Sequence, residues 1–245
     1  MARPLYLTIA LLCYAAFFAA FLYLVGFVGG FDFMPTHVDK GLDAPPVVAG
    51  LVNAGLIALF GIQHSVMARQ GFKRVWSKIV PKPVERSVYC LATVLALVAL
   101  FAFWHPLPGT VWAIENEIGR AAMWAAFWAG WGILFVSTWL LNHFELFGLQ
   151  QAWLHLRGRE AEPFRMRTPL FYKWVRHPLY TGFLIAFWAT PVMTWGHLLL
   201  AGGFTIYILI GIAHEERDLI DLFGEEYVAY RRSVGTLIPG VGRRA

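Results

Sequence analysis

LYLTIALLCYAAFFAAFLYLVGFV, residues 5–28, is an apolar run that contains no charged side chain. A helix of about 20 apolar residues crosses the hydrocarbon core of a bilayer. The run is longer than the apolar core of a cleaved signal peptide, about 7–15 residues, so we expect a membrane anchor. The whole chain is 58% hydrophobic and 14% charged, whereas soluble domains carry about 25% charged residues. The composition therefore predicts an integral membrane protein.

Further apolar segments follow this run, and the complete set is Leu5–Val28, Val47–Val66, Val84–Phe103, Ala121–Leu141, Leu179–Trp195 and Leu198–Ala213. The last two are short and are separated only by Gly196 and His197, which predicts a tight helical hairpin. Open strands are excluded in lipid, because unpaired backbone groups are too costly there. The predicted fold is therefore an all-α integral membrane protein of about six transmembrane helices, followed by a cytoplasmic amphipathic C-terminal helix.

The basic residues give the orientation. In a six-helix topology, all of the 20 Lys and Arg residues except Lys40 and Arg120 fall on one side of the membrane. Loops rich in Lys and Arg stay in the cytoplasm, so both termini are expected there. The net charge of +5 is explained by this asymmetry and by anionic lipid head groups, and no nucleic-acid partner is expected.

Two polar stretches on the cytoplasmic side stand out. In VRHPLYTG, residues 175–182, Arg176 and His177 precede Pro178 at an expected helix start, where the helix dipole favours an anion. In HEERDL, residues 214–219, Glu215 and Glu216 follow the last apolar segment, at an expected helix C-terminus that disfavours acids. Each stretch could also be a plain helix end exposed to water. Together they would suit a zwitterionic amino-acid group.

These stretches carry a resemblance to a known family. RHPLYTG, EERDL, FGEEYVAYRR and the late Pro239 resemble the isoprenylcysteine carboxyl methyltransferase superfamily of membrane methyltransferases, which use S-adenosylmethionine. Further upstream, the chain is similar to a bacterial branch that methylates methanethiol to dimethyl sulfide, through FGIQHSVMAR, PVERSVYC, NHFELFGLQQAW and FLIAFWATPVMTWGHLL. The resemblance covers nearly the whole chain. It implies one polytopic domain, 1–245, with four N-terminal helices in 1–141 and a methyltransferase core in 142–245, in a bacterial inner membrane.

The resemblance also implies roles for individual residues. The cofactor S-adenosylmethionine would be surrounded by Arg176, His177, Pro178, Tyr180, Gly182, Glu215 and Glu216. One of the two glutamates would pair with the α-ammonium of the cofactor. Gly182 would let a helix or a ligand come close. Tyr227 and Tyr230 share a helix face with apolar residues, so we expect them to pack rather than to bind.

Methyl transfer to sulfur requires the thiol to lose its proton, because the thiolate is the nucleophile. The candidate bases are His64, which is our first choice, and His143, Glu145 and His214. A hydrogen-bonded structural role is the alternative for His64 and His143, and Glu145 could instead hold an arginine. No metal is expected, because no Cys or His cluster has ligand spacing.

The expected substrate is a small apolar thiol, which can arrive through the bilayer, and no protein partner is predicted. A related enzyme that methylates a prenylcysteine carboxylate or a lipid amine is the alternative within the superfamily. A channel is a third possibility, but polar residues would then line the helices, whereas here they gather at one end.

Overall fold

The computed structural model describes residues 2–160 and 165–243, and within them the chain forms two compact units. The first unit comprises Met1–Gly109, Asn142–Pro163 and Thr194–Leu200, and the second comprises Thr110–Leu141, Phe164–Met193 and Ala201–Ala245. The division into residues 1–141 and 142–245 stays a prediction. So does the cytoplasmic placement of the termini, since residues 1 and 245 lie outside the described residues.

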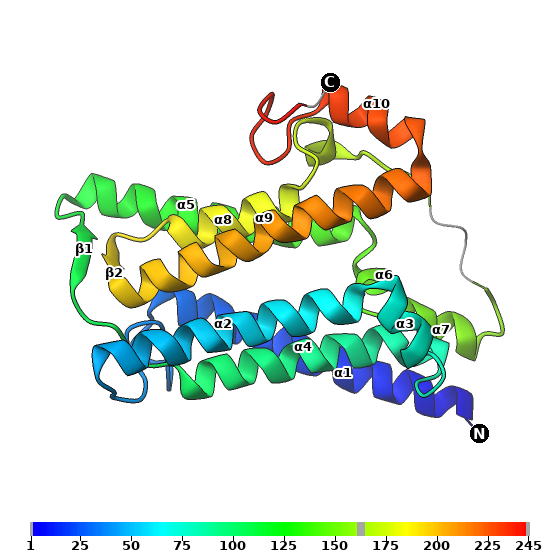
Figure 1. The fold of residues 1–245 in the computed structure, drawn as a ribbon, viewed down its shortest axis with the longest axis horizontal. Helices are drawn as coiled ribbons and strands as arrows, with labels where there is room; N and C mark the ends of the chain where they lie inside the picture. The colour runs from blue at the N-terminus through cyan, green and yellow to red at the C-terminus, as the bar shows by residue number, and fades with distance from the viewer. Residues whose placement is uncertain (1, 161–164, 244–245) are drawn as a thin grey trace. The chain divides into compact units, whose positions relative to one another are not determined.

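Three long helices form most of the first unit: α1 (Ala2–Gly29), α2 (Pro46–Ala68) and α4 (Lys82–Phe103). Helix α4 packs against both α1 and α2, and the three run side by side (Figure 1). Their shared core includes fully buried Phe27 and Leu100. Proline at the first turns of α2 and α4 suits a helix start, because the missing N–H needs no partner there. Short helices complete the unit: α3 (Gln70–Trp76), α6 (His143–Leu146) and α7 (Leu149–Leu156).

A fully buried amide holds the end of α4 in the first unit. Asn53 lies within the apolar helix α2 and is 0% exposed. Its Nδ2 donates to the His105 carbonyl at 2.6 Å, and its Oδ1 accepts from the His105 backbone N–H at 3.0 Å. The chain leaves α4 at Trp104, whose indole donates to the Val38 carbonyl at 2.9 Å. Asn53 therefore satisfies both backbone groups of His105, just beyond the end of α4.

Replacing Asn53 by alanine should lower the free energy of unfolding by about 1–3 kcal/mol, because the His105 backbone groups would lose their partners. Thermal or denaturant unfolding of the purified protein in detergent measures this loss. Leu51→Ala, two residues away on the same helix and 70% exposed, is the matched control. Equal stability of Asn53→Ala and wild type would contradict a stabilising role of the two hydrogen bonds between Asn53 and His105.

The second unit is built on α5 (Glu117–Leu140), α8 (Pro178–Trp188) and most of α9 (Trp195–Phe223). Helices α5 and α8 make the closest helix contact of this unit, through Gly130 and Gly182 (Figure 1). A Cβ atom added to Gly182 would lie 2.6 Å from the Gly130 carbonyl oxygen. Helix α9 joins α8 through the Phe187–Phe204 ring pair, whose centroids lie 5.4 Å apart. Gly182 thus allows a neighbouring helix to come close, which is one of its two predicted roles.

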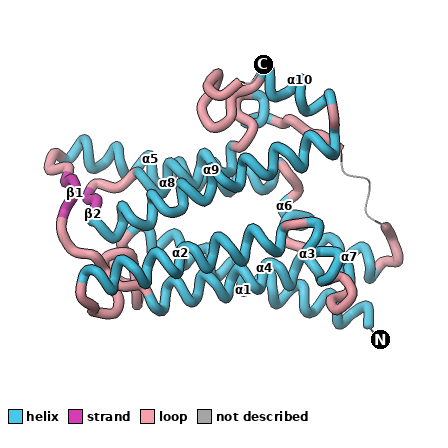
Figure 2. Tube along the Cα trace, in the orientation of Figure 1, coloured by secondary structure: helices cyan, strands magenta, loops and turns pink. Residues whose placement is uncertain are grey.

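The connection between the last two apolar segments differs from the predicted hairpin turn. Helix α8 ends at Trp188 and α9 begins at Trp195, so Gly196 and His197 lie in the first turn of α9 rather than between helices. The link instead contains β2 (Val192–Thr194), which pairs with β1 (Thr110–Ala113) in a two-stranded sheet (Figure 2). The pairing gives hydrogen-bond partners to backbone groups of the link, which would otherwise lack them. The prediction of a two-residue turn is therefore wrong.

The described part of the chain contains five helices long and apolar enough to cross a membrane: α1, α2, α4, α5 and α9. The all-α integral membrane fold is confirmed. The remaining predicted span corresponds to α8, which has 11 residues. Such a helix is about 16 Å long, roughly half the hydrocarbon thickness. A count of six crossings stays a prediction.

The end of α9 also differs from expectation. The last apolar segment was expected to end at Ala213, but α9 continues to Phe223. Glu215 and Glu216 therefore lie inside a helix, and the argument that they oppose a helix C-terminus is wrong. The helix continues because the residues after Ala213 are mostly good helix formers despite their charge. After Gly224, at φ +58°, the predicted C-terminal helix is present as α10 (Glu225–Ser233).

Candidate active site

The turn before α8 is fixed by the segment that follows α10. Val175 and Gly235 form a parallel bridge. The Arg176 and His177 backbone N–H groups donate to the carbonyls of Gly235 and Thr236, at 2.8 and 3.1 Å. Pro178 is buried at the first position of α8, where no N–H is needed. The RHP turn and the C-terminal segment are thus one local structure within the second unit.

Arg176 is 3% exposed and has its side-chain donors engaged within the protein. Its Nε and Nη2 reach Glu216 Oε1 at 2.8 and 2.7 Å. Its remaining hydrogen bonds go to α10 and the segment after it: the carbonyls of Arg231, Val234 and Gly242 and the hydroxyl of Thr236. A guanidinium has five N–H donors, and this network uses both terminal nitrogens and Nε. These contacts indicate that Arg176 organises the end of the chain.

Glu216 is 4% exposed and is surrounded by positive or hydrogen-bonding groups. Besides Arg176, the Arg231 Nε lies 3.3 Å from its Oε2, and the His177 Nε2 lies 3.4 Å from its Oε1. A buried carboxylate persists only when it is paired in this way. The charge of Glu216 is therefore already balanced by two arginines.

Glu215, the adjacent acid, has a different environment. Its side chain is 45% exposed, and its Oε2 lies 3.7 Å from the Nδ1 atom of His177, whose side chain is buried. The His177 ring lies 5.6 Å from the Tyr180 ring. The structure thus brings Arg176, His177, Glu215 and Glu216 into one cluster, within which Glu215 holds the accessible carboxylate. We call these residues, together with Arg231, the ion cluster.

Tyrosines from two elements lie beside the ion cluster: Tyr172 of the 3₁₀ turn Leu170–Lys173, and Tyr227 and Tyr230 of α10. The Tyr230 hydroxyl donates to the Tyr172 carbonyl at 2.5 Å. Burial raises the pKa of Tyr230 to about 12 and also raises the pKa of Tyr227, with the Glu216 charge adding to the latter. Both phenols therefore stay protonated at neutral pH.

Arg231 and the tyrosines were not among the predicted site residues. The motif FGEEYVAYRR was noted, but its periodicity indicated only packing. The complementary charges of Arg231 and Glu216 were a usable signal, since both belong to motifs of the same family resemblance.

The candidate bases divide between the units. His214 lies on α9, half-buried, next to Glu215. His64, His143 and Glu145 belong to the first unit. The Glu145 carboxylate accepts from Asn142 Nδ2 at 3.1 Å, so a structural contact of this acid is present.

Two candidate bases of the first unit, half-buried His64 and buried His143, each lie next to a hydroxyl. His64 Nδ1 lies 3.1 Å from Thr93 Oγ1, and that hydroxyl donates to the Tyr89 carbonyl at 3.1 Å. A hydroxyl has one proton, so His64 Nδ1 must be the donor in this pair. His143 Nε2 lies 2.7 Å from the Tyr14 hydroxyl, and burial lowers the pKa of His143. Burial of His143 thus favours its neutral imidazole.

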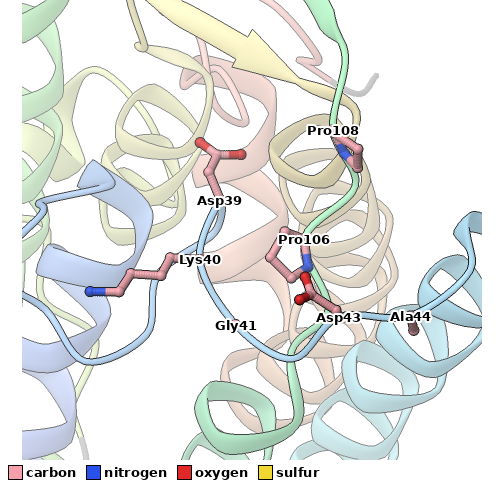
Figure 3. Close-up of a pocket in the computed structure, with 7 residues that line it drawn as sticks. All are labelled: Asp39, Lys40, Gly41, Asp43, Ala44, Pro106 and Pro108. Carbon is pink, nitrogen blue, oxygen red and sulfur yellow. The ribbon is translucent and has the colours of Figure 1, made fainter.

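A cavity of about 370 Å³ lies elsewhere in the first unit, between the loop after α1 and the segment after α4. Figure 3 shows its lining: Asp39, Lys40, Gly41, Asp43, Ala44, Pro106 and Pro108. The Asp39 carboxylate accepts from Thr194 at 2.5 Å, and Lys40 donates to the Met34 carbonyl at 3.0 Å. None of the predicted site residues lines this cavity, so we do not regard it as the active site.

Comparisons with known proteins give strong matches along the chain. The chain is 53% identical to Methanethiol S-methyltransferase 1 of Bradyrhizobium diazoefficiens, over 92% of this chain and 79% of the relative. It is 44% identical to Methanethiol S-methyltransferase of Crocosphaera subtropica, over 100% of this chain and 96% of the relative. It is 48% identical to Methanethiol S-methyltransferase of Mycobacterium tuberculosis, over 92% of each chain. No protein-family model and no solved structure matches.

Proposed function

Because the chain belongs to the methanethiol S-methyltransferase family, we propose that it transfers a methyl group from S-adenosylmethionine to methanethiol and so forms dimethyl sulfide. The observation that carries this proposal is the identity of 44–53% to relatives of that name, over at least 92% of this chain. We place the protein in a bacterial inner membrane, with both termini in the cytoplasm, on the basis of its basic loops and apolar helices.

The ion cluster fits a zwitterionic methyl donor. Glu215 presents a half-exposed carboxylate for the α-ammonium, whereas Glu216 is balanced by Arg176 and Arg231. His177 lies between the two acids, and Tyr180 lies next to it. Pro178 and Gly182 shape α8, so their part in donor binding is to position these neighbours. When bound, S-adenosylmethionine supplies a methyl group on a positively charged sulfur that is a good leaving group.

The reaction also requires removal of the thiol proton. The sulfur of methanethiol would form the new bond to the methyl carbon as the bond from that carbon to the donor sulfur breaks, with S-adenosylhomocysteine as the leaving group, and the thiol proton would pass to a base or to water. His64 lies near the end of α2 and pairs with Thr93 through Nδ1, and burial lowers the pKa of His143, which favours the neutral form that a base needs. His214 and Glu145 are the other candidates. An apolar surrounding excludes water and keeps the thiol close to its partner.

The experiment that tests the proposed function uses membranes containing the full chain. Methyl-labelled S-adenosylmethionine is added with methanethiol, longer thiols or a prenylated cysteine, and volatile product is measured in the headspace. Labelled dimethyl sulfide is expected from methanethiol. A folded protein that makes none, or that methylates only the prenylated cysteine, would overturn the proposal.

If one of the four candidates is the base, its replacement should change how turnover depends on pH. His64→Ala, His143→Ala, Glu145→Ala and His214→Ala are compared with wild type at saturating donor, and the variant without the base should lose about 10²–10⁴-fold in rate near neutral pH. The deficit should shrink as pH rises, because more methanethiol arrives as thiolate.

Donor affinity, measured by calorimetry, separates this effect from a binding defect, which alkali would not rescue. If all four variants keep the wild-type pH profile, the protein captures thiolate that forms in solution, and the base assignment is wrong.

A further inference from the structure

Two tyrosines of α10 lie three residues apart and differ in one respect. The Tyr230 hydroxyl donates to the Tyr172 carbonyl at 2.5 Å. Tyr227 is 3% exposed, and its hydroxyl oxygen is fully covered, yet it has no hydrogen-bond partner among the described residues. The two side chains therefore have different tasks, although the sequence gives them the same helix face.

An unsatisfied hydroxyl is costly in a buried position. Leaving such a group without a partner costs about 1–3 kcal/mol, and native proteins rarely keep one without a reason. Phenylalanine would fill the same space without that cost. The hydroxyl of Tyr227 is thus explained if its partner is a bound molecule rather than a protein group.

The charges near Tyr227 indicate which kind of partner this is. Glu216, Arg176 and Glu215 all act electrostatically on its hydroxyl. The guanidinium groups of Arg176 and Arg231 both lie against the carboxylate of Glu216, the charged group that acts most strongly on the Tyr227 hydroxyl. The carboxylate of a bound amino-acid group would be a further anionic partner for these two cations. A protonated phenol beside them can donate a hydrogen bond to that carboxylate.

The geometry points to Tyr227 as a donor-binding residue, whose hydroxyl donates a hydrogen bond to the carboxylate of the methyl donor's amino-acid group, while Glu215 accepts its ammonium. This assignment rests on the proposed function, because it takes S-adenosylmethionine as the donor. It gives the two ends of the amino-acid group separate partners within the second unit. Tyr230 instead holds α10 against the Leu170–Lys173 turn.

The test compares Tyr227→Phe with the matched control Tyr230→Phe, in the full chain purified in detergent. Calorimetry measures the affinity for S-adenosylhomocysteine, which keeps the amino-acid group and is stable, and thermal unfolding is measured without ligand. Tyr227→Phe should weaken binding by about 10- to 100-fold, as expected for a hydrogen bond to a charged group, and should leave the Tm unchanged or raised. Tyr230→Phe should lower the Tm, because the bond to the Tyr172 carbonyl is lost, and should keep the affinity.

A second ligand identifies the group that Tyr227 contacts. Decarboxylated S-adenosylmethionine lacks the carboxylate, so it should bind wild type and Tyr227→Phe equally. An equal loss for both ligands would overturn the assignment to the carboxylate. Unchanged affinity of Tyr227→Phe for S-adenosylhomocysteine, or a lowered Tm in that variant, would overturn a role in donor binding. If wild type binds neither ligand, the proposed function itself fails, and the inference fails with it.

Discussion

Glu216→Gln is expected to destabilise the protein by about 3–5 kcal/mol, because it leaves the buried charge of Arg176, and the charge of Arg231 beside it, without their carboxylate. Glutamine keeps the size of the side chain, so the loss reports the charge and not a cavity. The measurement is unfolding of the purified variant in detergent, by heat or denaturant. The loss should also release the C-terminal segment, which limited proteolysis after α10 would detect.

Glu215→Gln is the matched control for this substitution. It removes the same charge one residue away, from a side chain that is 45% exposed, so its effect on stability should be small. It should instead weaken binding of S-adenosylhomocysteine. Equal stability losses in the two variants would show that the acids share one role, contrary to the division made here between a structural and a ligand-facing glutamate.

Gly182→Ala is the second substitution with a large expected effect. The new Cβ would lie 2.6 Å from the Gly130 carbonyl oxygen and 2.7 Å from the Leu134 backbone nitrogen. Neither atom can move without shifting α5, so the free energy of unfolding should fall by about 3 kcal/mol, the upper part of the usual range for overpacking. Unfolding in detergent measures the change.

Gly202→Ala provides the control, because it makes the same change in helix α9 with no atom within 4 Å of the new Cβ. Alanine is a better helix former than glycine, so this variant should be as stable as wild type or more so. Donor affinity of Gly182→Ala, measured where the variant is folded, separates the two predicted roles of the residue. If Gly182→Ala keeps its affinity for the donor, the role of Gly182 is helix packing. If the variant is as stable as wild type but has lost donor affinity, a role in helix packing alone is contradicted.

The long helices could be predicted closely from sequence. The segment Leu5–Val28 corresponds to α1, and Val84–Phe103 corresponds to α4, because an uninterrupted apolar run is both the membrane signal and the helix. The end of α9 could not be predicted in this way. Hydropathy changes at His214, but helix formation depends on backbone geometry and residue propensity, and charged residues such as Glu and Arg continue a helix well.

The candidate site was predicted in part. Family motifs indicated Arg176, His177, Glu215 and Glu216, and the structure brings them together in the second unit. That Arg176 and Glu216 bind each other could not be read from the sequence, because spacing does not reveal which side chains meet after folding. The roles of Tyr227 and Tyr230 were also indistinguishable, since the difference lies in one hydrogen bond to Tyr172.

The hydrogen bonds of Arg176 to residues 231–242 have a consequence for biosynthesis. These residues follow every candidate membrane span in the order of translation. During synthesis the guanidinium therefore emerges long before most of its partners, and it must stay hydrated at the membrane surface until the last segment leaves the ribosome. Insertion of the spans and completion of the ion cluster are then separate events. A nascent chain already integrated in the membrane would still be unable to hold a methyl donor.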